Sequence, residues 1–91
     1  MTTTYTTVAQ LFVLAVLLAW QDNSTTETGF LIERARGLTG AFAVIATLPA
    51  NTQSYRDAQV KRRWTYCYRA RATAAVGTSA PSNTVCLTIP R

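Results

Sequence analysis

Residues 64–73 read WTYCYRARAT, the cleanest alternation of side chains in the sequence. Aromatic or alanine side chains occupy every second position from Trp64 to Ala72, and Thr, Cys or Arg side chains fill the positions between. A period of two is typical of a strand whose two faces meet different environments. The stretch therefore predicts a long strand with one face in a core and the other toward solvent.

Shorter segments of the same kind fill the rest of the chain. Strands are predicted over 6–13, 15–21, 42–48, 52–56 and 85–89, and a further strand places Phe30, Ile32 and Arg34 on one face. Turn-forming residues separate them at 22–29, between Gly37 and Gly40, and at 76–81. No segment has the periodicity of a helix. About seven short strands in 91 residues predict one all-β domain made of two packed sheets.

Composition argues against an enzyme. Hydrophobic residues make up 48% of the chain and charged residues 14%, which excludes a disordered chain, and there is no histidine. Nucleophile motifs, glycine-rich phosphate loops and Cys/His metal spacings are also absent from the sequence. Of the four acids, Asp22 and Glu27 share one loop, while Asp22 and Asp57 are expected to cap loops. We expect no catalytic site, no metal, no cofactor and no small-molecule substrate.

The apolar run at residues 11–20 (LFVLAVLLAW) raises the question of a membrane or targeting segment. It is too short for a membrane-spanning helix, which needs roughly 20 apolar residues. No cation precedes it and no small-x-small cleavage site follows it, so it does not match a signal peptide. We therefore interpret it as two strands and their turn. An export signal, if the protein has one, is expected to lie outside these residues.

Several segments taken together resemble the fibronectin type III family, in particular the modules attached to secreted bacterial enzymes and surface proteins. The resembling segments are LAWQDNS (18–24), ETGFLIER (27–34), YRD (55–57), YCYRARA (66–72) and GTSAPSN (77–83). They occur in the family's order and spacing and cover roughly residues 15–89 of one domain, 1–91. The resemblance implies a seven-stranded immunoglobulin-like antiparallel β-sandwich, with strands A, B and E packed on strands C, C′, F and G.

The resemblance also assigns core positions. Trp20 resembles the core tryptophan of strand B, and Tyr66 resembles the tyrosine corner, whose hydroxyl binds the backbone just upstream. Val60 fills a position where the family usually has leucine. The predicted core consists of Trp20, Phe30, Ile32, Val60, Tyr66 and Tyr68. The family often has a Pro-Gly turn before strand F, where this chain has Arg62-Arg63-Trp64, so the sequence leaves the geometry of that turn open.

Two cysteines fall on the strands that correspond to F and G. If these strands are antiparallel neighbours, Cys67 faces Cys86 on the outward side, and the same register opposes Arg69 to Thr84 and Arg71 to Ser82. Directly opposed Cβ atoms are close enough for a disulfide. We predict this disulfide, with two reduced surface thiols as the alternative. A disulfide in turn predicts an oxidising compartment, hence an extracellular or cell-surface location.

The remaining signals concern partners. The net charge is +5, and Lys61-Arg62-Arg63 stands next to Trp64, a composition enriched at protein interfaces. A solvated basic edge is the alternative, and no aromatic stacking platform for nucleic acid is evident. We predict a non-catalytic extracellular module for protein–protein interaction, adhesion or spacing. The alternatives are a self-assembling subunit of an extracellular or surface filament and an engineered binding scaffold. The predicted interface residues are Phe12, Leu14, Leu17, Leu31, Arg62, Arg63 and Trp64.

Overall fold

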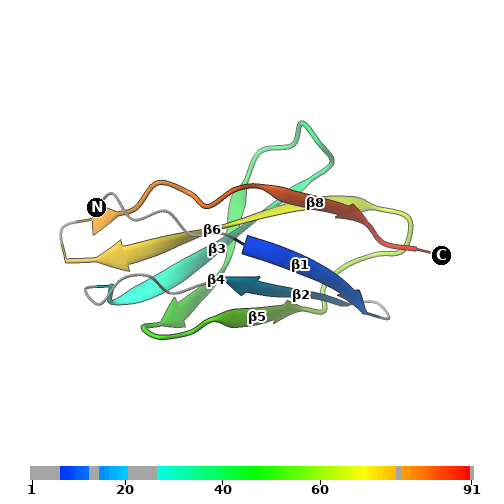
Figure 1. The fold of residues 1–91 in the computed structure, drawn as a ribbon. Helices are drawn as coiled ribbons and strands as arrows, with labels where there is room; N and C mark the ends of the chain where they lie inside the picture. Colours follow the sequence, from blue (N-terminus) through cyan, green and yellow to red (C-terminus); the bar gives the residue numbers. More distant parts are fainter. Residues whose placement is uncertain (1–6, 13–14, 21–26, 76, 91) are drawn as a thin grey trace.

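The computed structural model describes residues 7–12, 15–20, 27–75 and 77–90. In these ranges the chain forms two antiparallel sheets (Figure 1). The strands are β1 (Thr7–Phe12), β2 (Ala15–Trp20), β3 (Gly29–Arg36), β4 (Ala43–Pro49), β5 (Ser54–Asp57), β6 (Thr65–Ala74), β7 (Gly77–Thr78) and β8 (Val85–Thr88). One sheet has the order β1-β2-β5, and the other has the order β4-β3-β6, with β7 and β8 both beside β6.

This arrangement confirms the predicted all-β sandwich with strands A, B and E on one side. The apolar run at residues 11–20 contributes to β1 and β2, which pair with each other as antiparallel neighbours. The prediction of a plain loop over 76–81 is wrong in one respect, because Gly77 and Thr78 pair with the end of β6 as the short strand β7. No helix in the described part of the chain is long and apolar enough to cross a membrane.

The core lies between the two sheets and follows from the period of two. Strand β2 contributes Val16, Leu18 and Trp20, and the ring of Trp20 lies 5.5 Å from that of Phe30 on β3. All six residues predicted for the core are buried, and none is more than 8% exposed: Trp20, Phe30, Ile32, Val60, Tyr66 and Tyr68.

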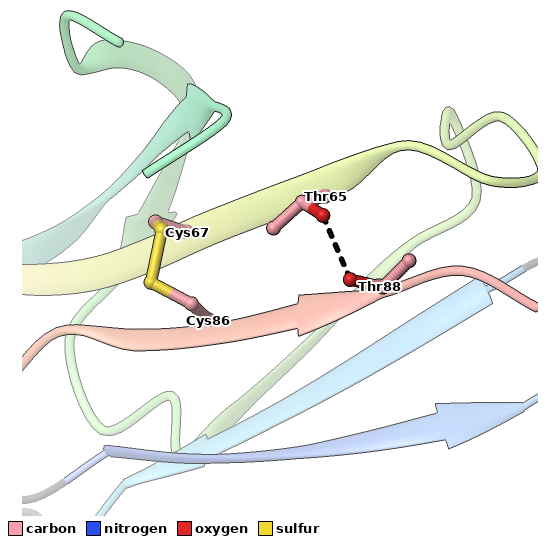
Figure 2. The surroundings of a disulfide bond; sticks show 4 residues. All are labelled: Thr65, Cys67, Cys86 and Thr88. Carbon is pink, nitrogen blue, oxygen red and sulfur yellow. Dashed lines mark hydrogen bonds between the residues drawn. A yellow bond between two sulfur atoms is a disulfide. The ribbon is translucent and has the colours of Figure 1, made fainter. Parts of the chain in front are cut away.

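The disulfide joins β6 to β8 on the outward face of the larger sheet (Figure 2). Cys67 pairs with Cys86 in the strand register, and their Cα atoms are 4.0 Å apart, the close spacing of a non-hydrogen-bonded antiparallel pair. On the same face, the hydroxyls of Thr65 and Thr88 share a hydrogen bond of 2.7 Å. Cys67 is buried, whereas Cys86 is exposed, so the disulfide is open to solvent from the β8 side.

The predicted register fails beyond this point. Strand β8 begins at Val85, so Thr84 does not pair with Arg69, and Ser82 lies beside Ala70 rather than opposite Arg71. Ser82 donates its N–H to the Ala70 carbonyl (2.8 Å), and its hydroxyl accepts from the Ala70 N–H (2.9 Å). Because a serine hydroxyl replaces a backbone carbonyl as the acceptor, the chain leaves the regular ladder here.

A buried carboxylate links the two sheets. Asp57, at the end of β5, is 2% exposed and accepts hydrogen bonds from the Tyr68 hydroxyl (2.7 Å) and the Arg34 guanidinium (2.8 Å) at one oxygen. Its other oxygen accepts from the Gln59 N–H (3.1 Å), which is the loop-capping role expected of it. Burial and the hydrogen bond to Asp57 raise the pKa of Tyr68 well above its ordinary value. Burial lowers the pKa of Arg34, but Asp57 outweighs this effect and leaves it raised.

Candidate binding surface around Trp64

The turn at residues 61–64 leads from β5 into β6. The Trp64 N–H donates to the Lys61 carbonyl at 3.3 Å, which closes a four-residue turn. Arg63 has a φ of 72°, in the left-handed region that favours glycine. Arginine thus adopts the conformation that the glycine of a Pro-Gly turn would adopt. For a non-glycine residue this conformation costs about 1–2 kcal/mol.

Three hydrogen bonds fix this turn to the body of the domain. The hydroxyl of Tyr66 accepts from the Lys61 N–H at 3.0 Å, so Tyr66 has the contact expected of a tyrosine corner. The Arg63 N–H donates to the Ile89 carbonyl (2.7 Å), and the Ile89 N–H donates to the Trp64 carbonyl (2.9 Å). Since Ile89 is buried, the backbone of the turn is anchored to the core.

Cations pack on the aromatic rings that follow the turn. The guanidinium carbon of Arg36 lies 3.1 Å from the centre of the Trp64 ring, and the Lys61 ammonium lies 4.8 Å from it. The Trp64 ring lies 6.1 Å from that of Tyr66, which carries Arg34 at 5.2 Å. Contacts of this kind contribute about 0.5–1 kcal/mol each where they are exposed.

The sequence of β3 explains why two arginines reach this place. Phe30 and Ile32 fill the core, and the same face of the strand continues as Arg34 and Arg36. In the sheet, Arg36 pairs with Tyr66 of β6. The inward face of the larger sheet therefore changes from apolar to basic where the core ends.

Two of the three described acidic residues, Glu33 and Asp57, form ion pairs with other arginines. Asp57 pairs with Arg34, and one oxygen of Glu33 accepts from both Arg69 (2.5 Å) and Arg71 (3.0 Å). Burial raises the pKa of Glu33, but the hydrogen bonds and charges of the two arginines outweigh it, so its pKa lies below the ordinary value.

Glu27 is remote from the turn. It precedes the first residue of β3, whereas Arg36 is the last, and about 23 Å of extended strand separate the two ends. Among the described residues, no ion pair involves the four exposed cations at this end of the sheet. We call these four cations, two of which pack on Trp64, together with that tryptophan the basic surface: Arg36, Lys61, Arg62, Arg63 and Trp64.

Comparisons with known proteins identify the fold. No family model matches the sequence, and no curated protein matches it. Among solved structures, the FN1–FN3 domains of chicken CNTN1 superpose with a TM-score of 0.87 at 16% identity, over all of this chain and 33% of that one. An Fn3-like protein from Clostridium thermocellum gives 0.75 at 20% identity, over 96% of this chain and 88% of that one. The chain has the fibronectin type III fold.

The same fold occurs within a larger enzyme. Pectate lyase PelI from Erwinia chrysanthemi matches with a TM-score of 0.82 at 21% identity, over 92% of this chain. This chain spans 28% of the pectate lyase chain and 33% of the CNTN1 chain. These likenesses concern the fibronectin type III fold alone.

The structure unites only part of the predicted interface. Arg62, Arg63 and Trp64 lie together on the basic surface, and Arg36 joins them although the sequence does not single it out. The strand register of β3 against β6 is the signal that could have found Arg36, because it follows from the two alternating patterns once one pair is known.

The apolar residues predicted for an interface lie elsewhere on the fibronectin type III fold. Leu17 is half-buried on β2 opposite Arg56, and Leu31 is half-buried on β3 of the other sheet. The side chain of Phe12 and the whole of Leu14 lie outside the described residues. Among the residues whose exposure the structure describes, the large exposed hydrophobic ones are instead Leu38 (77%) and Val44 (51%), which the sequence does not single out.

The carboxylates of the described residues are not arranged as a catalytic pair or a metal site. Both Glu33 and Asp57 are bound to arginines, and the described residues contain no cluster of three or more His, Cys, Asp or Glu that could hold a metal ion. Asp22, expected to share a loop with Glu27, lies outside the described residues.

Proposed function

We propose that this chain is a non-catalytic extracellular module that binds another protein through the basic surface. The observation that carries the proposal is the set of four exposed cations of the basic surface, which lack an acidic partner in the described residues; two of them, Arg36 and Lys61, pack on Trp64. Arginine and tryptophan are two of the three residue types, with tyrosine, that are enriched among the side chains contributing most to protein binding. A module that served only as a spacer would have no need for a surface of this kind.

The rigidity of the turn supports the same role. Its backbone is held by Tyr66 and by two hydrogen bonds to Ile89, so the cations project from a fixed frame. A preformed surface loses less conformational entropy on binding than a loop that must become ordered.

The extracellular location rests on the disulfide. Cross-linked cysteines persist in oxidising compartments, and Cys86 is exposed to whatever reductant surrounds the protein. A cytosolic protein with an exposed disulfide of this kind would be reduced by the thiol pool.

The test compares two variants with the same change in net charge. Arg62→Glu reverses a charge on the basic surface, whereas Arg56→Glu reverses one on β5, in the other sheet. Wild type and both variants are immobilised, and the secreted and surface proteins of the source organism that each retains are quantified by mass spectrometry. We expect proteins that wild type and Arg56→Glu retain and Arg62→Glu loses.

Two results would contradict the proposal. If wild type retains nothing above background, the chain is a spacer. If Arg62→Glu retains the same proteins as wild type, binding occurs on another face. Circular dichroism and urea denaturation of each variant exclude unfolding as the cause of a loss.

A further inference from the structure

The charge of the basic surface restricts the chemistry of a partner. Arg36, Lys61, Arg62 and Arg63 are exposed together, and the described carboxylates are either bound to other arginines or at the far end of β3. Such a surface attracts anions and repels other basic proteins. Three of the four cations are arginines, whose planar guanidinium groups match a carboxylate with two parallel hydrogen bonds.

The aromatic residue of the surface is not free to stack on a ligand. Trp64 already carries the Arg36 guanidinium at 3.1 Å, with the Lys61 ammonium at 4.8 Å, and it is half-buried. Proteins that bind single-stranded nucleic acid offer open aromatic faces on which bases stack. The geometry of Trp64 therefore disfavours a nucleic-acid partner and leaves ionic contacts as the main mode of recognition.

An exposed apolar side chain follows one of the cations, Arg36, closely in the chain. The hairpin after β3 projects beyond the sheets (Figure 1), and within it Leu38 is 77% exposed, two residues after Arg36. The backbone of this hairpin begins next to the turn, because the Gly37 N–H donates to the Thr65 carbonyl at 2.8 Å. A basic surface with an exposed leucine in the adjoining hairpin matches a polypeptide that offers carboxylates to the cations and apolar side chains to the leucine.

The backbone of Arg63 provides an independent observation. Glycine at this position would relieve the left-handed conformation, while the hydrogen bond from its N–H to Ile89 would remain. The other described non-glycine residue with positive φ is Asn51, a residue type that tolerates this region. Arginine at position 63 thus costs stability, which is typical of a residue kept for recognition.

We propose that the basic surface binds an acidic polypeptide segment with interspersed apolar residues, and that Arg63 determines this specificity at the expense of fold stability. The proposal rests on the proposed function as a protein-binding module. It adds the chemical class of the partner and the residue that selects it.

The probe is a fluorescein-labelled peptide of repeated Glu-Glu-Leu units, with Gln-Gln-Leu repeats as the control, measured by fluorescence anisotropy near physiological salt. We expect the Glu peptide to bind with an affinity that falls as salt rises, and the Gln peptide not to bind.

The protein variants test the role of Arg63. Arg63→Gly should weaken binding of the Glu peptide about tenfold, the effect of one charged hydrogen-bonding group, while raising the urea midpoint. Arg62→Gln should weaken binding similarly without raising the midpoint, and Arg56→Gln, with the same loss of charge, should leave the affinity within about twofold.

Several results would overturn this proposal. The first is the absence of Glu-peptide binding, and the second is an Arg63→Gly variant that binds as tightly as wild type. The third is stronger binding of heparin or of a thymidine oligonucleotide, either of which would assign the surface to another class of polyanion. If the peptide fails while extracellular proteins are still lost by Arg62→Glu, only the acidic segment is wrong. If that loss is also absent, the proposed function is wrong as well.

Discussion

The hydrogen bonds of Asp57 predict that an amide cannot replace this carboxylate. One oxygen accepts from Tyr68 and Arg34, and the other accepts from the Gln59 N–H. A carboxylate has acceptors at both positions, whereas asparagine has an acceptor at one and a donor at the other. In either orientation of Asp57→Asn, the NH₂ group therefore faces a group that itself donates.

The expected loss is large for a substitution of nearly constant volume. Removing one partner of a buried ion pair costs about 3–5 kcal/mol, because the other charge is left without compensation. The Arg34 side chain is 23% exposed, so water restores part of its solvation, and we expect about 3 kcal/mol for Asp57→Asn. The total stability of a domain of this size is about 5–10 kcal/mol, so the variant should fold but only marginally.

The measurement is urea denaturation followed by tryptophan fluorescence. With a urea slope of about 1–2 kcal/mol/M, the midpoint should fall by about 1.5–3 M. Glu33→Gln is the matched control, because it makes the same chemical change in ion pairs on the outward face. The Glu33 side chain is 13% exposed against 3% for Asp57, so water compensates more of the loss and we expect a smaller cost, about 1 kcal/mol. An Arg34→Gln/Asp57→Asn double-mutant cycle should give a coupling energy above about 1 kcal/mol. A midpoint for Asp57→Asn equal to that of Glu33→Gln would refute the argument.

Three further predictions concern the disulfide and the titrating groups. Alkylation of the denatured, unreduced protein should add no mass at Cys67 or Cys86, and reduction should cost about 3 kcal/mol for a loop of this length; a mass shift of two adducts would contradict the first part. The pKa of Glu33 in the folded protein lies below its ordinary value of 4.5, so Glu33 contributes to the free energy of unfolding above pH 4.5 and loses this contribution as the pH falls further. Glu33→Gln should therefore make the free energy of unfolding fall less steeply with decreasing pH in this acid range. The pKa of Tyr68 in the folded protein lies far above 10.0, so Tyr68 contributes to the free energy of unfolding below pH 10 and loses this contribution progressively as the pH rises above 10. Tyr68→Phe should therefore reduce the slope of the free energy of unfolding against pH in this alkaline range by about 1.4 kcal/mol per pH unit. An unchanged slope would argue that Tyr68 is open to solvent.

The part of this fold that the sequence predicts is the part that follows from the alternation of side chains along a strand. It places Tyr66 and Tyr68 in the core and Cys67 on the outward face, and one register between β6 and β8 then brings Cys67 to Cys86. These inferences need only the alternation of side chains along a strand and the neighbourhood of two strands. The same reasoning fails at Ser82, because a buried hydroxyl that replaces a backbone acceptor leaves no periodic signal.

The basic surface can be predicted from the sequence only where its residues are neighbours in the chain. Arg62, Arg63 and Trp64 are adjacent in the sequence and can be predicted as a group, but Arg36 comes from another strand and requires the register of β3 against β6. The left-handed residue Arg63 also donates a hydrogen bond to Ile89, which lies 26 residues further along the chain, and no local pattern in the sequence predicts that contact. Asp57 caps a loop, as the sequence predicts, yet its contacts with Tyr68 and Arg34 arise only when the two sheets pack together.

The position of Tyr66 links the core to the basic surface and leads to a final prediction. Its ring is buried in the core, and its hydroxyl holds the Lys61 N–H at the start of the turn. Tyr66→Phe leaves that N–H without its partner, at about 1–3 kcal/mol, and loosens the backbone that carries Lys61 and the two arginines. We therefore expect Tyr66→Phe to weaken binding of the Glu-Glu-Leu peptide severalfold, although a buried phenol does not reach the peptide. Arg69→Ala, which removes an outward cation without touching the turn, should leave the affinity nearly unchanged. If Tyr66→Phe lowers the urea midpoint but leaves the affinity intact, the two hydrogen bonds to Ile89 suffice to hold the turn, and the tyrosine corner supports the fold without shaping the surface.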